Sequence, residues 1–99
     1  MYRLLVADDE MIERAVLVQL LEEECRIFQA ENGREALEVY EKEKIQIAVL
    51  DIEMPGITGI EAAQRIREKD KDCCIIFLTA FDEFSYAKKA ITIRALDYL

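Results

Sequence analysis

Short apolar runs alternate with helix-like segments along the whole 99-residue chain, and this alternation restricts the fold more than any other feature. Strands are predicted over residues 3–7, 26–31, 47–51, 74–79 and 95–99. Helices are predicted between them, over residues 11–23, 33–43, from the end of the loop 52–59 to about residue 69, and near 83–91. Such alternation favours a parallel sheet with right-handed crossovers and helices on both faces.

The smallest common fold of this kind is α/β and flavodoxin-like, a doubly wound sheet of five parallel strands in the order 2-1-3-4-5. The continuous apolar run 47–51 is typical of a strand buried on both faces, and the weaker alternation of 26–31 indicates an edge strand. One domain accounts for residues 1–99. The fold needs a closing helix after its last strand, so we expect a domain truncated at its C-terminal end, or a face covered by a homodimer or by strand exchange.

The helical segments have recognisable apolar positions, which we expect to form their apolar faces. In the first helix these positions are Met11, Ile12, Ala15, Val16 and Leu20. In the second they are Ala36, Leu37 and Tyr40, and in the third Ile60, Ala63 and Ile66.

Two of the predicted strands end in carboxylates. Asp8 and Asp9 follow the first strand, and Asp51 closes the third. The order 2-1-3-4-5 places the topological switch point between these two strands, at the sheet edge where ligands bind. Three carboxylates in one pocket would repel one another without a cation, and their hard oxygens suit Mg²⁺. The sequence therefore predicts a magnesium-dependent site.

Composition excludes several other kinds of chemistry. The chain contains no histidine, which excludes histidine acid–base catalysis, histidine metal ligands and a phosphohistidine carrier. Its three glycines form neither familiar nucleotide-phosphate loop. The formal net charge of -8 argues against direct contact with nucleic acid or with an anionic membrane. No apolar run could span a bilayer and the N-terminus lacks the layout of a signal peptide, so we expect a cytoplasmic protein.

A carboxylate beside a cation can act as a nucleophile and form an acyl phosphate. Asp51 is the best placed carboxylate for this role, and a backbone carbonyl from the loop after it could complete the octahedral coordination of the cation. Thr79, at the end of the fourth strand, could donate its hydroxyl to a phosphoryl oxygen.

Each of these residues also has an ordinary structural interpretation. Asp9 and Glu10 stand where N-capping and the helix dipole favour acidic residues. Asp51 could simply begin a turn. Thr79 and Tyr98 are of types common in strands.

Four motifs follow one another along the chain: Val6-Ala7-Asp8-Asp9-Glu10, residues 49–59 (VLDIEMPGITG), Leu78-Thr79-Ala80 and residues 95–99 (ALDYL). In this order, and together covering essentially the whole chain, they resemble the receiver domain of bacterial two-component response regulators. The resemblance implies that Asp51 accepts a phosphoryl group from a sensor histidine kinase. It also implies a switch pair, Thr79 and Tyr98. The metal ligands it implies for Mg²⁺ are Asp8, Asp9, Asp51 and the backbone carbonyl of Glu53.

Residues 81–90 further resemble receivers joined to AraC-type DNA-binding output domains. The resemblance implies that any DNA contact belongs to a C-terminal output domain outside these residues. Two positions depart from the family pattern. The family's phosphate-contacting lysine follows the aromatic residue by a few positions, beyond Leu99, and Arg94 stands where the family often has glycine.

The preferred function is therefore a phosphorylatable signalling domain, not a classical enzyme. A phosphate-independent, receiver-like interaction module is the alternative, which an unresponsive complete domain would favour. A third is a Mg²⁺-dependent phosphatase of the haloacid-dehalogenase type, which also uses an Asp after a strand. That type usually has a second Asp two residues later, where this chain has Glu53.

Overall fold

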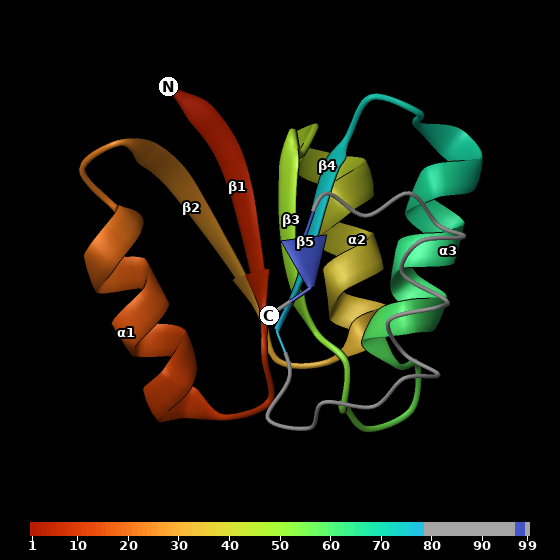
Figure 1. The fold of residues 1–99 in the computed structure, drawn as a ribbon, viewed down its shortest axis with the longest axis horizontal. Coiled ribbons are helices and arrows are strands. Elements are labelled where there is room, and N and C mark those ends of the chain that lie inside the picture. The colour runs from red at the N-terminus through yellow and green to blue at the C-terminus, as the bar shows by residue number, and fades with distance from the viewer. Residues whose placement is uncertain (79–96, 99) are drawn as a thin grey trace.

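The structure is a computed structural model that describes residues 1–78 and the backbone of residues 97–98 (Figure 1). Its elements are β1 (Tyr2–Ala7), α1 (Met11–Leu21), β2 (Cys25–Ala30), α2 (Gly33–Glu43), β3 (Ile47–Asp51), α3 (Gly59–Lys69), β4 (Cys74–Leu78) and β5 (Asp97–Tyr98). Every element predicted within residues 1–78 is present, with ends that differ by at most two residues. The helix predicted near 83–91 lies outside the described residues.

The strands pair in parallel, and the first four follow the order β2-β1-β3-β4. In the register of the sheet, Ala7 at the end of β1 lies opposite Ala30 of β2 on one side and Leu50 of β3 on the other. The predicted order of these four strands and the edge position of β2 are confirmed. Of the strand predicted over 95–99, the two residues of β5 are described, and they pair in parallel with β4.

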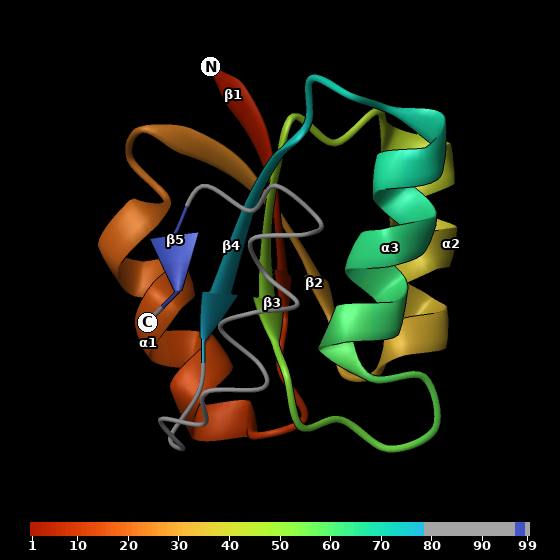
Figure 2. The same cartoon turned by 45° about the vertical axis from the view of Figure 1, so that its right-hand side comes forward.

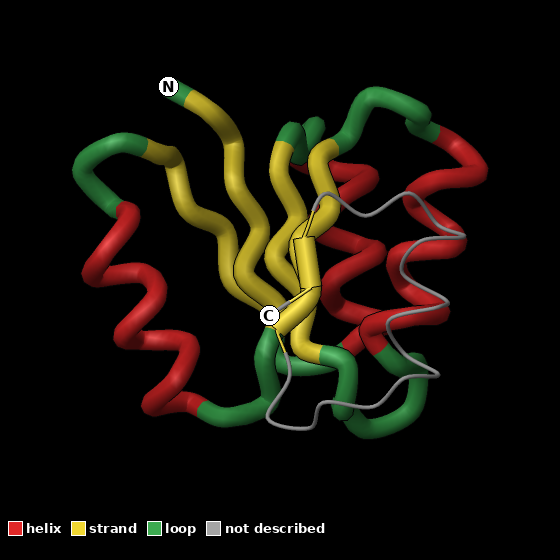
Figure 3. Tube along the Cα trace, viewed as in Figure 1, coloured by secondary structure: helices red, strands yellow, loops and turns green. Residues whose placement is uncertain are grey.

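Helices lie on both faces of the sheet, with α1 on one face and α2 and α3 side by side on the other (Figures 1, 2 and 3). Strand β1 contributes side chains to the cores on both faces of the sheet, because successive side chains of a strand point in opposite directions. Leu5 and Ala7 belong to the larger core cluster, which includes residues of α2 and α3, whereas Leu4 and Val6 belong to a smaller cluster packed by α1. The core positions predicted for α3 are all buried: Ile60, Ala63 and Ile66.

Helix α1 is oriented differently from the expectation. All five of its expected apolar-face residues are exposed: Ala15, Met11 at 71%, Ile12 at 78%, Val16 at 49% and Leu20 at 72%. Leu17 and Leu21 pack against the smaller cluster instead. Gln19 is the only polar residue in the second half of this helix, so apolar periodicity does not single out one face. The expected face of this helix was therefore wrong, and large apolar side chains remain at the surface.

No helix within the described part of the chain is long and apolar enough to cross a bilayer.

The loop between β3 and α3 returns closely to the end of β3. The Gly59 amide donates to the carbonyl of Ile52 at 3.0 Å, and the Thr58 side chain caps α3 by accepting from the amide of Glu61 at 3.2 Å. A Cβ atom on Gly59 would lie 2.1 Å from the backbone oxygen of Asp51, which no side chain can tolerate. Glycine at this position therefore lets the start of α3 contact the residue that ends β3.

Candidate functional site

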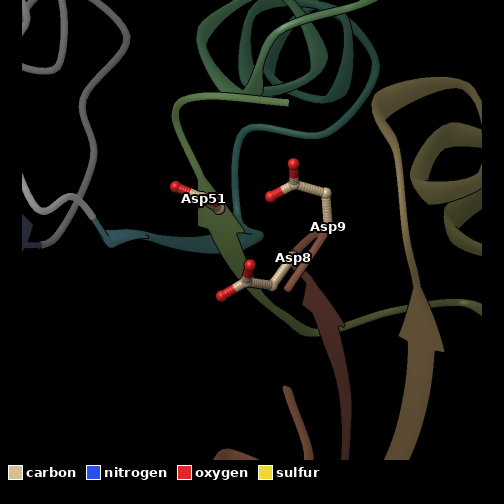
Figure 4. A group of neighbouring side chains, drawn as sticks. All are labelled: Asp8, Asp9 and Asp51. Atoms are coloured by element: carbon tan, nitrogen blue, oxygen red, sulfur yellow. The ribbon is translucent and has the colours of Figure 1, made fainter. Parts of the chain in front are cut away.

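Three carboxylates converge at the carboxyl ends of β1 and β3. Figure 4 shows Asp8 and Asp9 just beyond the end of β1, and Asp51 at the end of β3. One carboxylate oxygen from each residue lies within 4.8 Å of the others. Asp8 is buried, Asp51 is half-buried and Asp9 is exposed. The predicted convergence of these three side chains is confirmed, and the cluster is open to solvent on the side of Asp9.

Asp8 is held by hydrogen bonds on three of its four polar atoms. Its backbone amide donates to the carbonyl of Ala30 at 3.0 Å, and its Oδ1 atom accepts from the amide of Glu10 at 2.9 Å. Its backbone carbonyl accepts from Nη1 of Arg14 at 2.7 Å. The fourth atom, Oδ2, is buried and has no hydrogen-bond partner among the described residues. A buried carboxylate oxygen without a donor is costly, and a cation beside it would remove that cost.

The N-capping interpretation of Asp9 and Glu10 does not hold. The N-cap residue of α1 is Glu10, and its side chain makes no capping hydrogen bond. Asp9 precedes that position. The Glu10 amide is instead bound by the side chain of Asp8. Helix capping therefore does not account for the pair of aspartates after β1.

Asp51 holds its proton far more tightly than an ordinary carboxyl. Burial, followed by the charge of Asp8, raises the pKa of Asp51 from 3.8 to about 7, and Asp9 adds to this effect. The amide of Glu53 opposes the shift by donating to Oδ1 of Asp51, but this bond is long at 3.4 Å. The turn interpretation of Asp51 thus accounts for one weak contact, while the dominant features are burial and like charge.

Glu13 is a fourth acidic residue near the site, and it was not predicted. It lies in the first turn of α1. A side-chain hydrogen bond with Asp8, followed by the charge of Asp8, raises the pKa of Glu13. Glu13 therefore belongs to the same acidic cluster as Asp8, Asp9 and Asp51. The available sequence signal was an acidic residue in the first helical turn after a doubled Asp.

The remaining predicted site residues have different outcomes. Thr79 lies outside the described residues. Tyr98 belongs to β5, where only the backbone is described. Glu53 is exposed on the loop after β3, and its carbonyl stays a predicted metal ligand.

The donor set fits a hard divalent cation. Three carboxylates offer oxygen ligands at mutually short distances, and one of their oxygens is buried without a donor. No ion pair among the described residues involves Asp8, Asp9 or Asp51. Mg²⁺ prefers oxygen ligands in octahedral geometry and keeps several waters, which suits a cluster with an exposed side.

A parallel sheet with helices on both faces and an acidic pocket at its switch point defines an α/β protein of the CheY-like fold. A CheY-like receiver domain protein from Methanospirillum hungatei has this fold, with a TM-score of 0.95 at 23% identity, covering 100% of this chain and 80% of that one. The chain belongs to the response regulator receiver domain family, whose family model matches residues 4–99. It is thus a signalling module, and the phosphatase alternative is set aside.

Individual relatives are consistent with this family. The sensory transduction protein LytT of Oceanobacillus iheyensis is 44% identical over 101 residues, which cover 97% of this chain. LytT of Bacillus subtilis is 37% identical over 102 residues, covering 100% of this chain. The chain spans 40% of the length of the first relative and 42% of the second. The AraC-type output sub-family stays a prediction.

One similar structure contains a metal. The response regulator protein TrrA from Thermotoga maritima, solved in complex with Mg²⁺-BeF, is 43% identical with a TM-score of 0.88. The alignment covers 100% of this chain and 85% of that one.

Proposed function

We propose that this chain is a phosphorylatable receiver domain, in which Asp51 accepts a phosphoryl group from a sensor histidine kinase with the help of Mg²⁺. The observation that carries the proposal is the meeting of Asp51 with Asp8 and Asp9, with the Oδ2 atom of Asp8 buried and unpaired. Carboxylates placed in this way need a cation between them, and a cation would also attract a phosphoryl group. The Mg²⁺ in the similar TrrA structure supports the same choice of ion.

Accessibility favours Asp51 over Asp8 as the nucleophile. Asp8 is fully buried, and its Oδ1 atom is occupied by the amide of Glu10. Asp51 is half-buried, and its Oδ1 atom accepts a long hydrogen bond of 3.4 Å from the amide of Glu53. An oxygen of Asp51 can therefore approach a phosphoryl group without first losing a strong hydrogen bond.

The proposed transfer is a direct displacement at phosphorus. An oxygen of Asp51 forms a bond to phosphorus, while the bond from phosphorus to the histidine nitrogen of the kinase breaks and the nitrogen keeps the electron pair. The product is an acyl phosphate on Asp51. When bound, Mg²⁺ would neutralise the carboxylates and the phosphoryl oxygens. Its protein ligands would be Asp8, Asp9, Asp51 and the carbonyl of Glu53.

The register of the sheet supports the proposed switch pair. Asp51 lies opposite Leu78 in the pairing of β3 with β4, and the Ile52 amide donates to the carbonyl of Leu78 at 3.1 Å. Thr79 is the next residue in sequence, so its hydroxyl is the proposed contact to the phosphoryl group. Tyr98, whose backbone pairs opposite Phe77, is the proposed second member.

We further propose that the switch controls a DNA-binding output domain in a longer cytoplasmic protein. The relatives are longer than this chain, and one similar structure, a DNA-binding response regulator of the LuxR family from Staphylococcus aureus, is 31% identical with a TM-score of 0.93. The net charge of -8 on this chain would leave DNA contact to the output domain, for which the AraC type is our specific proposal.

The test is phosphoryl uptake from acetyl phosphate, followed by intact mass. With Mg²⁺, the wild-type chain should gain one phosphoryl group, and chelation of the metal should prevent the gain. Asp51→Asn should gain none, because it lacks the nucleophile. Asp72→Asn is the matched control, since Asp72 is exposed in the loop before β4, and it should behave like wild type. Uptake by Asp51→Asn would contradict the assignment. No uptake by wild type, repeated on a complete domain that includes the family's lysine, would favour the phosphate-independent module.

A further inference from the structure

One arginine side chain joins three elements beside the acidic pocket. Arg14, in the first half of α1, donates from Nη1 to the backbone carbonyl of Asp8 at 2.7 Å. It also donates from Nε to the Oε1 atom of Gln29 on β2 at 3.2 Å. The guanidinium therefore connects α1 to the segment that follows β1 and to the end of strand β2.

The hydrogen bond from Arg14 restrains the backbone of Asp8, one of the three residues that form the acidic pocket. The carbonyl of Asp8 is also the start of the peptide that leads to Asp9, so this peptide cannot rotate without losing the bond to Arg14. The other restraints on Asp8 come from the carbonyl of Ala30 and the amide of Glu10. Arg14 completes this set and leaves Oδ2 of Asp8 as the unpaired atom within the cluster.

We propose that Arg14, anchored by Gln29, is a positioning residue for the magnesium site. By holding the carbonyl of Asp8, it keeps the carboxylates of Asp8 and Asp9 turned toward one cation. The inference rests on the proposed function, because it needs the cation site at Asp8, Asp9 and Asp51. Groups that orient metal ligands without touching the metal commonly change metal affinity by about 10- to 100-fold when they are removed.

The charge of Arg14 predicts the opposite effect. A guanidinium near the pocket repels a divalent cation, so removing its charge alone should strengthen Mg²⁺ binding. Removing its hydrogen bonds should weaken Mg²⁺ binding, because Asp8 and Asp9 would then sample orientations that do not bind. The sign of the change in affinity therefore distinguishes positioning from simple electrostatics.

The experiment is calorimetric titration of the 99-residue chain with Mg²⁺ alone. Arg14→Met keeps an apolar stem and removes both donors, and we expect Mg²⁺ affinity about tenfold weaker than wild type. Arg14→Lys keeps the charge but lacks the planar fork that serves two acceptors, so its affinity should lie between the two. Arg26→Met is the matched control, since Arg26 is exposed near the start of β2, at the opposite end of the sheet, and should bind like wild type.

A second variant keeps the test decisive if Arg14→Met folds poorly. Gln29→Ala leaves the bond to Asp8 in place and removes only the anchor, so it should show a smaller loss of affinity. Far-UV circular dichroism of each metal-free variant checks that the titrated protein is folded. A purely structural role would lower the stability of the metal-free chain without changing the Mg²⁺ affinity of its folded form.

The possible results separate this inference from the proposed function. If the wild-type chain binds Mg²⁺ and Arg14→Met binds it equally or more tightly, the positioning role is overturned and the magnesium site stands. Equal binding by wild type, Arg14→Lys and Gln29→Ala would overturn it in the same way. If the wild-type chain does not bind Mg²⁺, the proposed site and the positioning role both fail.

Discussion

Replacing Asp51 by Asn should stabilise the metal-free chain at pH 8. The substitution keeps the shape of the side chain and an oxygen that can accept from the amide of Glu53. It removes a charge that is partly buried and repelled by Asp8 and Asp9, the causes that raise the pKa of Asp51 to about 7. In the absence of metal, the ionised form of Asp51 therefore opposes folding.

The magnitude follows from the two proton affinities of Asp51. A tenfold change in proton affinity corresponds to about 1.4 kcal/mol, so the rise from 3.8 to about 7 sets a ceiling of about 4 kcal/mol. Asp51 is only half-buried, and solvent screens charges that water can reach. We therefore expect Asp51→Asn to raise the free energy of unfolding by about 1–2 kcal/mol at pH 8.

The gain should depend on pH with a definite sign. The folded chain binds the Asp51 proton more tightly than the unfolded chain does, so this group contributes most stability below pH 3.8, its ordinary pKa. That contribution is lost as the pH rises toward about 7, the pKa in the folded chain. The advantage of Asp51→Asn over wild type should therefore grow from about pH 4 to about pH 7 and stay constant above that range.

Urea unfolding followed by far-UV circular dichroism measures both effects. With a chelator present, Asp51→Asn should have the higher midpoint at pH 8, and the control Asp72→Asn should match wild type. Saturating Mg²⁺ should stabilise wild type more than Asp51→Asn, because a ligand that binds the folded state stabilises it. If Asp51→Asn is no more stable than wild type without metal at pH 8, the electrostatic reasoning about Asp51 is refuted.

Two further predictions concern the packing that supports the site. Gly59→Ala should lower the free energy of unfolding by about 1–3 kcal/mol, since its Cβ would meet the backbone oxygen of Asp51 at 2.1 Å; urea unfolding checks this, and a change below about 0.5 kcal/mol would contradict it. Phe77→Ala should lower it by about 3–5 kcal/mol because Phe77 is fully buried. Leu20→Ala, at a 72% exposed position of α1, should change the free energy of unfolding by less than about 0.5 kcal/mol. Equal losses for Phe77→Ala and Leu20→Ala would contradict the buried position of Phe77 and the exposed position of Leu20.

The order of the first four strands and the meeting of the carboxylates were predictable from local patterns. Parallel α/β sheets allow few chain paths, so identifying where β1 and β3 end was enough to place Asp8, Asp9 and Asp51 together. The buried residues of α3 were also predictable, because its polar and apolar residues separate clearly on opposite faces.

The orientation of α1 was not predictable in this way. Its second half is apolar on nearly every side, so only packing against the smaller cluster selects Leu17 and Leu21 over Val16 and Leu20. A periodic pattern identifies the buried face of a helix only when the other face is polar.

By itself, the sequence determined the alternation of strands and helices and the carboxylates at the strand ends. Only the tertiary structure decided how those carboxylates behave. The pKa of Asp51 depends on burial and on the charge of Asp8, which lies far from it in sequence. The bonds from Arg14 to Asp8 and Gln29 likewise depend on where α1 lies against the sheet. Local patterns specify elements, whereas electric fields and hydrogen bonds between elements exist only once the elements are packed.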